Sequence, residues 1–414
     1  MKNNSPLSTV NFQLPKGWEV KSLGEVCDFQ NGFAFKSKTY KEEGIPVVRI
    51  TNIQDEKLDL TKIIYINPKD YNQDLSKYKI VKGDLLIAMS GATTGKIGIH
   101  KTDEELLLNQ RVGKFKPKHA LDKKYLLNFL KTKVDESLAI SVGSAQPNLS
   151  TGQIKGFQIP LPLLTKQQLI VKILDKAFVE IDKAKQNAEQ NLRNAKEVFQ
   201  STLQSIFDNG KLKVENGEWV EKTLKQVCEK ITDGTHQTPK YFDSGVIFLS
   251  SKNVTSGKID WDKIKYIDEK QHIEMHKRVA PKVNDILLAK NGTTGVAAMV
   301  DRDVVFDIYV SLAHIRVLDE VLPNFMLYFI NSPVAKKQFN KRLKGVGVPN
   351  LHLQEIREVV ITFPKSIQEQ KQVVAQLDDL STETKKLETI YQKKLDNLAE
   401  LKKSILQKAF RGEL

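Results

Sequence analysis

Two long stretches of the chain carry apolar residues at the spacing of a coiled-coil helix. The second stretch, residues 367–410, contains neither Gly nor Pro, and its mostly apolar seam alternates spacings of three and four. The seam positions are Leu377, Leu380, Thr384, Leu387, Tyr391, Lys394, Leu398, Leu401 and Ile405. At about 1.5 Å per residue this helix would be roughly 65 Å long, so we expect it to need a partner helix.

The partner is predicted in the same chain, at residues 165–207, which are also free of Gly and Pro. Its seam is mostly small: Leu174, Ala177, Ile181, Ala184, Ala188, Asn191, Ala195, Val198 and Thr202. A bulky seam can pack closely against a small one. Asn191 and Lys394 would place polar groups in mid-seam, where they can fix the register. The alternative is two separate amphipathic helices, each packed on its own domain.

The rest of the chain is a tandem repeat of about 200 residues, in which the order of the matched segments is preserved. The matched segments are 18–27 with 219–228, 44–53 with 245–254, 62–66 with 263–267, 84–88 with 285–289, 93–95 with 293–295, and 147–149 with 349–351. Cys27 and Cys228 occupy the same place in the two repeats, so we expect two buried apolar fillers rather than a disulfide.

The repeat predicts an α+β protein: two mixed α/β domains joined by a long antiparallel two-helix coiled coil. Strands are expected at 45–50, 84–89, 246–251 and 285–290, and short helices at 121–131 and 323–331. The predicted parts are an N-terminal tail (1–16), a first domain (17–163), a first long helix (164–210), a second domain (211–364) and a second long helix (365–414).

Charge favours an anionic partner. The chain has 64 Lys and Arg against 50 Asp and Glu, a formal net charge of +14. Nucleic acid and a membrane surface both fit this balance, and so does a merely Lys-rich soluble protein. No apolar run approaches the ~20 residues of a membrane span, and the first ten residues lack an apolar signal core. We therefore expect a cytoplasmic protein.

Catalysis is not expected of this chain. Gly91-Ala-Thr-Thr-Gly95-Lys96 resembles a phosphate-binding P-loop, but its glycines are one residue too close, and Ile97 follows where Ser or Thr is needed. We identify no Asn-Pro-Pro-Tyr or Asp-Pro-Pro-Tyr motif, no dinucleotide fingerprint, no metal-spaced Cys/His cluster and no nucleophile elbow. His236 and His314 are interpreted as solvated or core groups. The prediction is a chain with no active site, cofactor or metal.

Polar loops at matching places in the two repeats suggest contact with DNA. Asn and Gln can bind adenine with two hydrogen bonds, Arg and Lys can bind guanine, and Ser, Thr and Lys bind phosphates. The candidate DNA-binding residues are Asn31, Lys36, Ser37, Lys38, Arg49, Thr51, Asn52, Ser90, Thr93, Thr94, Lys96, Thr235, His236, Gln237, Thr238, Lys240, Lys252, Asn253, Lys290, Asn291, Thr293 and Thr294. Each loop taken alone could be an ordinary turn. The two repeats share their framework residues but differ in the side chains of these loops. This difference favours two reading surfaces with different DNA targets.

A weaker signal lies at the end of each repeat. Gln146, Asn148 and Asn350 stand in or beside a Pro-Asn-Leu segment. They could contact DNA, hold a partner subunit, or form a Pro-Asn turn.

The ordered duplication resembles the specificity subunit of type I restriction–modification systems. The resemblance rests on Trp18…Leu23-Gly-Glu-Val at the unit start and on Gln146-Pro-Asn148-Leu149 at its end. Ile159-Pro-Leu-Pro…Gln167-Gln168 and Phe363-Pro…Glu369-Gln370 then open the long helices. The chain departs slightly from the family pattern at Thr165-Lys166 and at Pro364-Lys-Ser-Ile.

The resemblance implies two target recognition domains, each reading one half of a split, asymmetric sequence in double-stranded DNA. It implies that the helices bind two modification (methyltransferase) subunits, which carry S-adenosylmethionine, and that two restriction subunits join this core, with no membrane partner. One rival hypothesis is a coiled-coil adaptor with no role at DNA, which a salt-dependent gel shift would distinguish. Another is a divergent methyltransferase, which would bind S-adenosylmethionine on its own.

Overall fold

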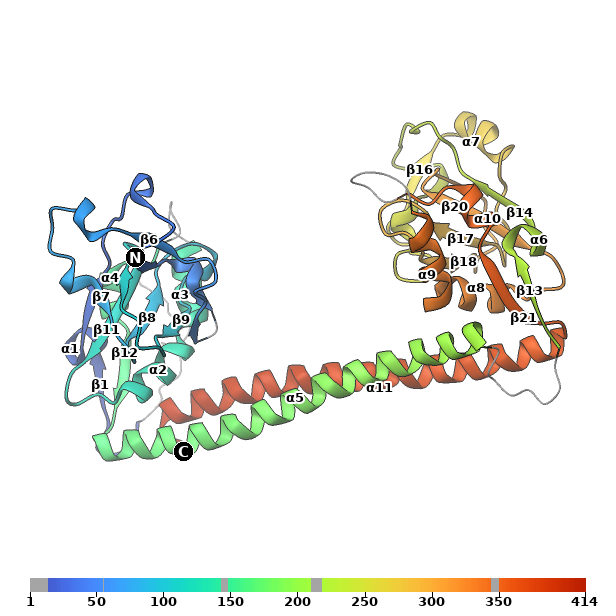
Figure 1. The fold of residues 1–414 in the computed structure, drawn as a ribbon. Helices are drawn as coiled ribbons and strands as arrows, with labels where there is room; N and C mark the ends of the chain where they lie inside the picture. Colours follow the sequence, from blue (N-terminus) through green and yellow to red (C-terminus); the bar gives the residue numbers. More distant parts are fainter. Residues whose placement is uncertain (1–13, 55, 143–147, 210–217, 344–349) are drawn as a thin grey trace. The chain divides into compact units, whose positions relative to one another are not determined.

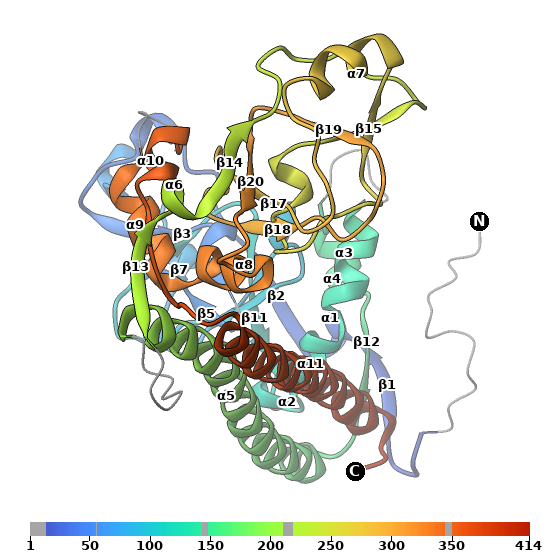
Figure 2. The ribbon, with the colours of Figure 1, turned by 90° about the vertical axis from the view of Figure 1, so that its right-hand side faces the viewer.

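The computed structural model describes residues 14–54, 56–142, 148–209, 218–343 and 350–414. The chain divides into two compact units, and each unit contains part of both long helices (Figures 1 and 2). Unit 1 comprises Met1–Asn187 with Lys394–Leu414, and unit 2 comprises Ala188–Lys393. The predicted domains therefore each lie in one unit, whereas the long helices are divided between the units.

The described part of unit 1 contains two four-stranded sheets and two two-stranded ones, β1-β12 and β4-β5. One sheet is antiparallel, with the order β2-β11-β8-β9, and the other has the order β6-β3-β10-β7 with β3 parallel to β10. The elements are β1 (Glu19–Ser22), α1 (Leu23–Val26), β2 (Cys27–Asn31), β3 (Ile45–Val48), β4 (Ile53–Gln54), β5 (Lys57–Leu58), β6 (Ile64–Ile66), β7 (Lys79–Ile80), β8 (Leu85–Ala88), β9 (Ile97–Ile99), β10 (Leu106–Leu108), β11 (Val112–Pro117), α2 (Lys123–Thr132), α3 (Val134–Val142), α4 (Thr151–Lys155) and β12 (Gln158–Leu161).

Unit 2 repeats this plan. Its sheets have the orders β14-β20-β17-β18 and β16-β15-β19, again with one parallel pair, β15 and β19. The elements are β13 (Trp219–Thr223), α6 (Leu224–Val227), β14 (Cys228–Asp233), β15 (Val246–Leu249), β16 (Lys265–Ile267), α7 (Glu269–His276), β17 (Ile286–Ala289), β18 (Ala297–Met299), β19 (Phe306–Ile308), β20 (Leu312–Val317), α8 (Pro323–Asn331), α9 (Pro333–Arg342), α10 (Leu353–Arg357) and β21 (Val360–Pro364). The predicted tandem repeat is thus a repeat of structure.

The two ends of each domain meet in a short antiparallel ribbon. β1 pairs with β12, with Glu19 opposite Leu161. β13 pairs in the same way with β21, with Trp219 opposite Pro364. Each domain therefore begins and ends beside the long helix that follows it in the chain.

The predicted strands and short helices are observed, and each is shifted by at most a few residues at its ends. Central strands β8 and β17 are buried on both faces, as expected for uninterrupted apolar runs. Asp122 caps α2 by accepting hydrogen bonds from the backbone N–H groups of Lys124 and Tyr125. Cys27 and Cys228 are free and buried, as predicted. Burial raises the pKa of each thiol to about 12, so both remain protonated apolar fillers.

The two long helices are α5 (Leu164–Asn209) and α11 (Ile367–Arg411). In unit 1 the start of α5 packs with the end of α11, where the Phe410 ring lies 4.9 Å from the Tyr125 ring of α2. In unit 2 the end of α5 packs with the start of α11, where the Phe207 ring lies 5.3 Å from the Phe325 ring of α8. The helices are therefore antiparallel within each unit, as predicted. No helix in the described ranges is long and apolar enough to cross a membrane.

The predicted seam of each helix consists of two sets of positions, each repeating every seven residues. One set lies at the helix contact as predicted, and the other set lies on its flank. On α11, Leu377 and Thr384 are buried as predicted, but Leu387 and Leu401 are 41% and 45% exposed. On α5, Val198 is likewise 48% exposed. A two-helix contact buries only a narrow stripe of each helix, so residues on the flank of a wider apolar band remain accessible.

The two polar residues expected in the middle of the seam do not lie at the helix contact. Asn191 and Lys394 are exposed, and their neighbours Leu192 and Leu395 are the half-buried residues. The prediction of a polar register device was therefore wrong. An apolar side chain one position further on takes the inward place, because burying it is more favourable than burying an amide or an ammonium group.

One glutamine joins each long helix to its domain. Gln167, fully buried, accepts a hydrogen bond from the Asp122 N–H at 2.8 Å and donates to the carbonyls of Ala120 and Pro162. Gln370 repeats these three bonds with the Leu322 N–H and the carbonyls of Glu320 and Pro364. We call this arrangement the glutamine clamp. Every partner of the two glutamines is a backbone group. The clamp therefore depends on the backbone path of the domain and not on the identity of the domain's side chains.

Candidate nucleic-acid interface

A buried asparagine shapes the first polar loop of each unit. Asn52 accepts a hydrogen bond from the Arg49 N–H and donates to the Asp59 carbonyl. Asn253 accepts from the Ser250 N–H and donates to the carbonyls of Asp260 and Lys263. Both side chains are at most 6% exposed. Sequence analysis predicts them at the DNA surface, but their amides are used to hold a turn.

An aspartate precedes the central strand of each unit; Asp285 is buried and Asp84 is half-buried. Asp84 pairs with Lys114, and Asp285 pairs with His314 and Arg316, all at 2.7–3.1 Å. Burial alone would raise the pKa of Asp285, but the hydrogen bonds from His314 and Arg316 outweigh it and lower the pKa to about 2 from 3.8. His314 is accordingly a buried core group, one of the interpretations made from the sequence; its Nε2 bonds Asp285, whereas its Nδ1 has no partner among the described residues.

Replacing Asp285 with Asn is expected to destabilise unit 2 by about 2 kcal/mol at pH 7, because a pKa lowered by nearly two units is worth about that much. The folded pKa lies below the unfolded one. The contribution is therefore complete above about pH 4 and is lost as pH falls through about 2. Urea unfolding across this pH range measures it, with exposed Asp319→Asn as the control. A deficit that persisted unchanged at pH 2 would contradict the assignment.

The first candidate loops begin at equivalent glycines. A Cβ on Gly32 would lie 2.0 Å from the Asn109 carbonyl oxygen, and one on Gly234 would lie 1.8 Å from that of Ile308. Only glycine allows this approach of two chain segments. It places Asn31 and Asp233 at matching positions at the ends of β2 and β14.

In unit 1 the chain forms an open hollow beside Asn31, with a volume of about 410 Å³. Asn31 exchanges hydrogen bonds with the Thr151 hydroxyl at its rim. Gln110 and Arg111 come from the turn between β10 and β11, and Asn148 comes from the segment before α4. The hollow thus collects three amide side chains and the Arg111 guanidinium from three chain segments.

Other candidate residues of unit 1 form an exposed basic loop. Lys36, Ser37 and Lys38 are exposed around a 3₁₀ turn, and Thr51 is exposed at the end of the next loop. Arg49 is half-buried and donates to the Lys62 carbonyl. Lys36 and Lys38 are therefore free to approach an anionic backbone.

The loop after β8 is more structural than expected. Ser90 and Thr94 are at most 2% exposed, and the hydroxyl of Thr94 donates to the Gly91 carbonyl. Thr93 is half-buried and donates to the Ile50 carbonyl, and the half-buried Lys96 leads into β9. The P-loop resemblance ends here, because a strand follows the loop where a P-loop requires a helix N-terminus.

In unit 2 the matching place holds an ionic network. Lys290 pairs with Asp233 at 2.8 Å, and Arg278 pairs with the same carboxylate at 2.5 Å. Burial would raise the pKa of Asp233, but these hydrogen bonds lower it. The Lys290 side chain is 7% exposed and neutralised, so the expectation that it contacts DNA is corrected. His236 lies 3.3 Å from Asp233 and is largely exposed.

The remaining candidates of unit 2 border this network. Thr235 is half-buried, and Gln237, Thr238, Lys240 and Lys252 are exposed. Asn291 and Thr294 are half-buried and Thr293 is exposed, in the turn after β17. This surface offers amide, hydroxyl, imidazole and ammonium groups from three loops.

The Pro-Asn-Leu segments pair with the loops after the central strands. Asn148 forms a bridge with Ser90, and Asn350 forms the matching bridge with Asn291. Both asparagines are thereby held beside the candidate surfaces by backbone pairing, which favours the turn interpretation. Gln146 lies outside the described residues.

Sequence analysis missed several polar groups. Gln110 and Arg111 occupy a short turn between two framework strands and looked like part of the framework. Lys336, Lys337 and Lys341 of α9 line a second hollow, of about 580 Å³, in unit 2. His272 and His276 of α7 were also overlooked, although a spacing of four on a helix is a known signal for a shared ligand.

Known proteins resemble this chain over nearly its full length. The family model described as "Type I restriction modification DNA specificity domain" matches residues 15–190 and again 216–397. The EcoBI specificity subunit of Escherichia coli is 25% identical, covering 96% of this chain and 86% of the relative. The EcoKI specificity subunit of Escherichia coli K12 is 24% identical, covering 97% and 90%.

Solved structures share the fold. A chain from a structure on complex assembly and conformational transition of the type I R-M system has a TM-score of 0.77 at 19% identity, covering 97% of this chain and all of that one. The HsdS subunit from Thermoanaerobacter tengcongensis has a TM-score of 0.59 at 18% identity, covering 98% and 99%. The doubled domain with long helices is thus an established architecture.

Proposed function

Because the chain belongs to the type I restriction–modification DNA specificity family, it is the DNA specificity subunit of such a system and not a catalytic subunit; we propose that each unit reads one half of a bipartite, asymmetric DNA target. The observation that carries the proposal is the repeat of one framework with different exposed side chains at matching loops. Two similar domains with different surfaces are suited to two different half-sites.

Unit 1 is proposed to read bases with the residues around its hollow. Asn31, Gln110 and Asn148 can each bond an adenine edge, and Arg111 can bond the O6 and N7 atoms of guanine. Lys36 and Lys38 on the neighbouring loop would hold phosphates and contribute affinity without sequence preference.

Unit 2 is proposed to read a different sequence with its loop after β14. Gln237 and His236 supply base-reading groups, whereas Thr238, Lys240 and Lys252 suit phosphates. The buried pair of Asp233 and Lys290 lies at the base of this loop and would hold it in place. A loop supported in this way loses less conformational freedom on binding than an unsupported one.

The long helices are proposed to bind modification subunits, two per chain, with two restriction subunits joining the complex, as the family resemblance implies. Support comes from apolar side chains left exposed on the helices. In unit 1, Leu169, Ile173 and Val179 of α5 are 36–65% exposed, and in unit 2 Leu387 and Ile390 of α11 are 41% and 58% exposed. Exposed apolar groups on one element are typical of a protein interface. A complex working on DNA would be cytoplasmic.

Neutralising one phosphate contact should weaken the salt dependence of binding. For Lys36→Gln we expect the slope of log K against log salt to fall by roughly 1, since one phosphate contact accounts for about that much. Lys183→Gln, on an exposed position of α5, should leave the slope unchanged. A gel-shift series from low to physiological salt with the assembled complex measures both. If Lys36→Gln and Lys96→Gln alike left the slope unchanged, these loops would not contact the backbone.

A further inference from the structure

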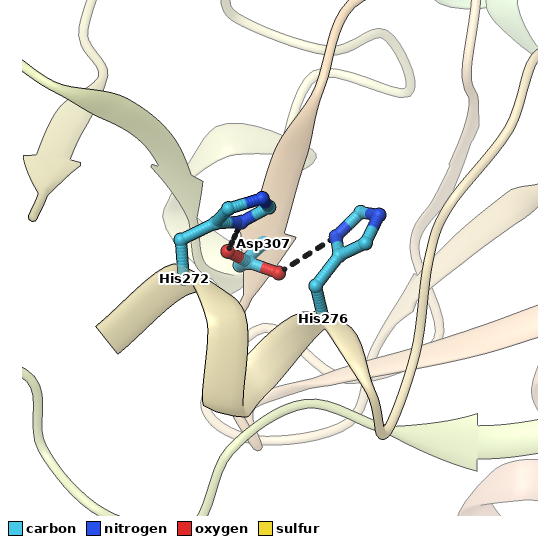
Figure 3. A group of neighbouring side chains, drawn as sticks. All are labelled: His272, His276 and Asp307. Carbon is cyan, nitrogen blue, oxygen red and sulfur yellow. Dashed lines mark hydrogen bonds and ion pairs between the residues drawn. The ribbon is translucent and has the colours of Figure 1, made fainter. Parts of the chain in front are cut away.

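Two histidines and a buried aspartate meet in unit 2. His272 and His276 lie one turn apart on α7, and Asp307 lies at the centre of β19 (Figure 3). The Nδ1 atoms of His272 and His276 lie 2.7 and 3.1 Å from the two oxygens of Asp307. Asp307 is 1% exposed, whereas the side chains of His272 and His276 are 14% and 31% exposed. The cluster is therefore buried at its carboxylate and open at its outer edge.

The fold does not need a charge at this place. In unit 1 the strand equivalent to β19 is β10, and Leu107 stands where Asp307 does, because Leu107 pairs with Val47 as Asp307 pairs with Phe248. The positions equivalent to the two histidines are Tyr71 and Leu75, which pack with Leu107 in one apolar cluster. Burying a carboxylate is costly unless it has strong partners. Unit 1 fills the same place with apolar side chains, so the fold does not require the charged cluster of unit 2.

The three side chains form a donor set for a metal ion. One nitrogen of each ring and one carboxylate oxygen all lie within 4.8 Å of one another. Tetrahedral zinc with bonds of about 2.0 Å places its donors roughly 3.3 Å apart, so only a small inward adjustment is needed. Two imidazoles and a carboxylate suit zinc and similar transition metals, whereas Mg²⁺ and Ca²⁺ prefer all-oxygen sets.

We propose that His272, His276 and Asp307 bind a divalent transition metal of the zinc type, with a water as a fourth ligand at the exposed side of His276. The metal would replace the hydrogen bonds between the rings and the carboxylate. Unit 1 has no such site, because Tyr71, Leu75 and Leu107 supply no comparable donors.

The site would act on the DNA-reading loop of unit 2, an effect that rests on the proposed function. Gln271, between the two histidines on α7, accepts a hydrogen bond from the Lys240 N–H at 2.8 Å and donates to the Lys240 carbonyl at 3.0 Å. Lys240 ends the loop that carries Thr235, His236, Gln237 and Thr238. A metal that fixes α7 against β19 would therefore stiffen this loop and sharpen the reading of one half-site only.

The test is a Zn²⁺ titration of the full-length chain, treated with chelator and held in complex with its modification subunits. We expect the wild-type chain to bind one equivalent of Zn²⁺ and the His276→Ala variant to bind none at this site. Bound Co²⁺ should give the visible absorption spectrum of a four-coordinate site. At a hundredfold excess over Kd, Zn²⁺ should raise the Tm of unit 2 by about 5 °C. His119→Ala, which removes an exposed histidine of unit 1, should change nothing.

A second variant guards against misfolding. His272→Tyr, His276→Leu and Asp307→Leu together copy the apolar solution of unit 1, and this triple variant should fold and lose the bound equivalent. Failure of the folded wild-type complex to take up stoichiometric Zn²⁺ or Co²⁺ would overturn the site and leave a hydrogen-bonded His–Asp–His cluster. A triple variant that still bound one equivalent of metal would also overturn the site.

The effect on reading is measured separately. Removing the metal should reduce discrimination against base changes in one half of the target and leave the other half unaffected. Metal binding with unchanged discrimination in both halves would overturn the coupling to the loop. Because metal uptake, the Co²⁺ spectrum and Tm are measured without DNA, they do not depend on the proposed function.

Discussion

Replacing residues 217–363 with the same region of a related specificity subunit is expected to change one half of the methylated sequence completely and to leave the other half intact. The replaced segment carries all candidate reading residues of unit 2. It leaves the hollow of unit 1 and the loop with Lys36 untouched. Since direct base contacts come from side chains within one domain, the two halves should change independently.

Methylome sequencing of a host that expresses the hybrid with its modification subunit measures the outcome. The reciprocal replacement of residues 17–163 is the matched control and should change the opposite half only. Intact complex formation shows that each hybrid is folded. A change in both halves, or in neither, would show that the domains do not read independently.

Adding seven residues to both long helices, near Asn191 and Lys394, is expected to change the preferred spacer between the half-sites. Seven residues are one heptad, so the seam keeps its phase. Each helix grows by about 10 Å at 1.5 Å per residue, close to three base pairs at about 3.4 Å each. If the paired helices set the separation of the reading domains, as the tandem repeat predicts, the variant should select a longer spacer or bind weakly.

Selection from a pool of DNA with randomised spacers decides this prediction. The control variant carries the insertion in one helix only. It should lose stability, because its seam no longer matches that of the other helix. Full-affinity binding of the doubly lengthened protein to the original spacer would falsify the hypothesis that the paired helices set the spacer length.

The architecture was largely predictable because its signals are periodic or duplicated. Central strands such as β8 read as uninterrupted apolar runs, and the long helices lack Gly and Pro over their whole length. The seam was predicted less well. A heptad pattern is compatible with either of two neighbouring sets of positions at the helix contact. Leu387 and Leu401 are apolar although they lie on the flank of this contact. Only the position of the opposing helix chooses between the two sets.

The candidate surfaces were harder to predict because exposure depends on partners far away in the sequence. Lys290 looks like a phosphate contact until Asp233, 57 residues away, is seen to neutralise it. Asn52 and Asn253 look like base readers, but their amides satisfy backbone groups several residues further along. Arg111 carries no signal in the sequence, because nothing in its short turn indicates that it lines a hollow. Asp307 carried no signal at all, since its histidine partners lie in another element.

The glutamine clamp has an evolutionary consequence. Gln167 and Gln370 recognise a domain only through backbone N–H and carbonyl groups, and each domain presents its two ends together in one ribbon. An unrelated sequence that follows the same chain path would satisfy the same bonds. Genetic recombination within the segments that encode the helices could therefore deliver a foreign domain to a junction that already accepts it. New specificities would then arise in a single exchange, without a series of compensating mutations at the join.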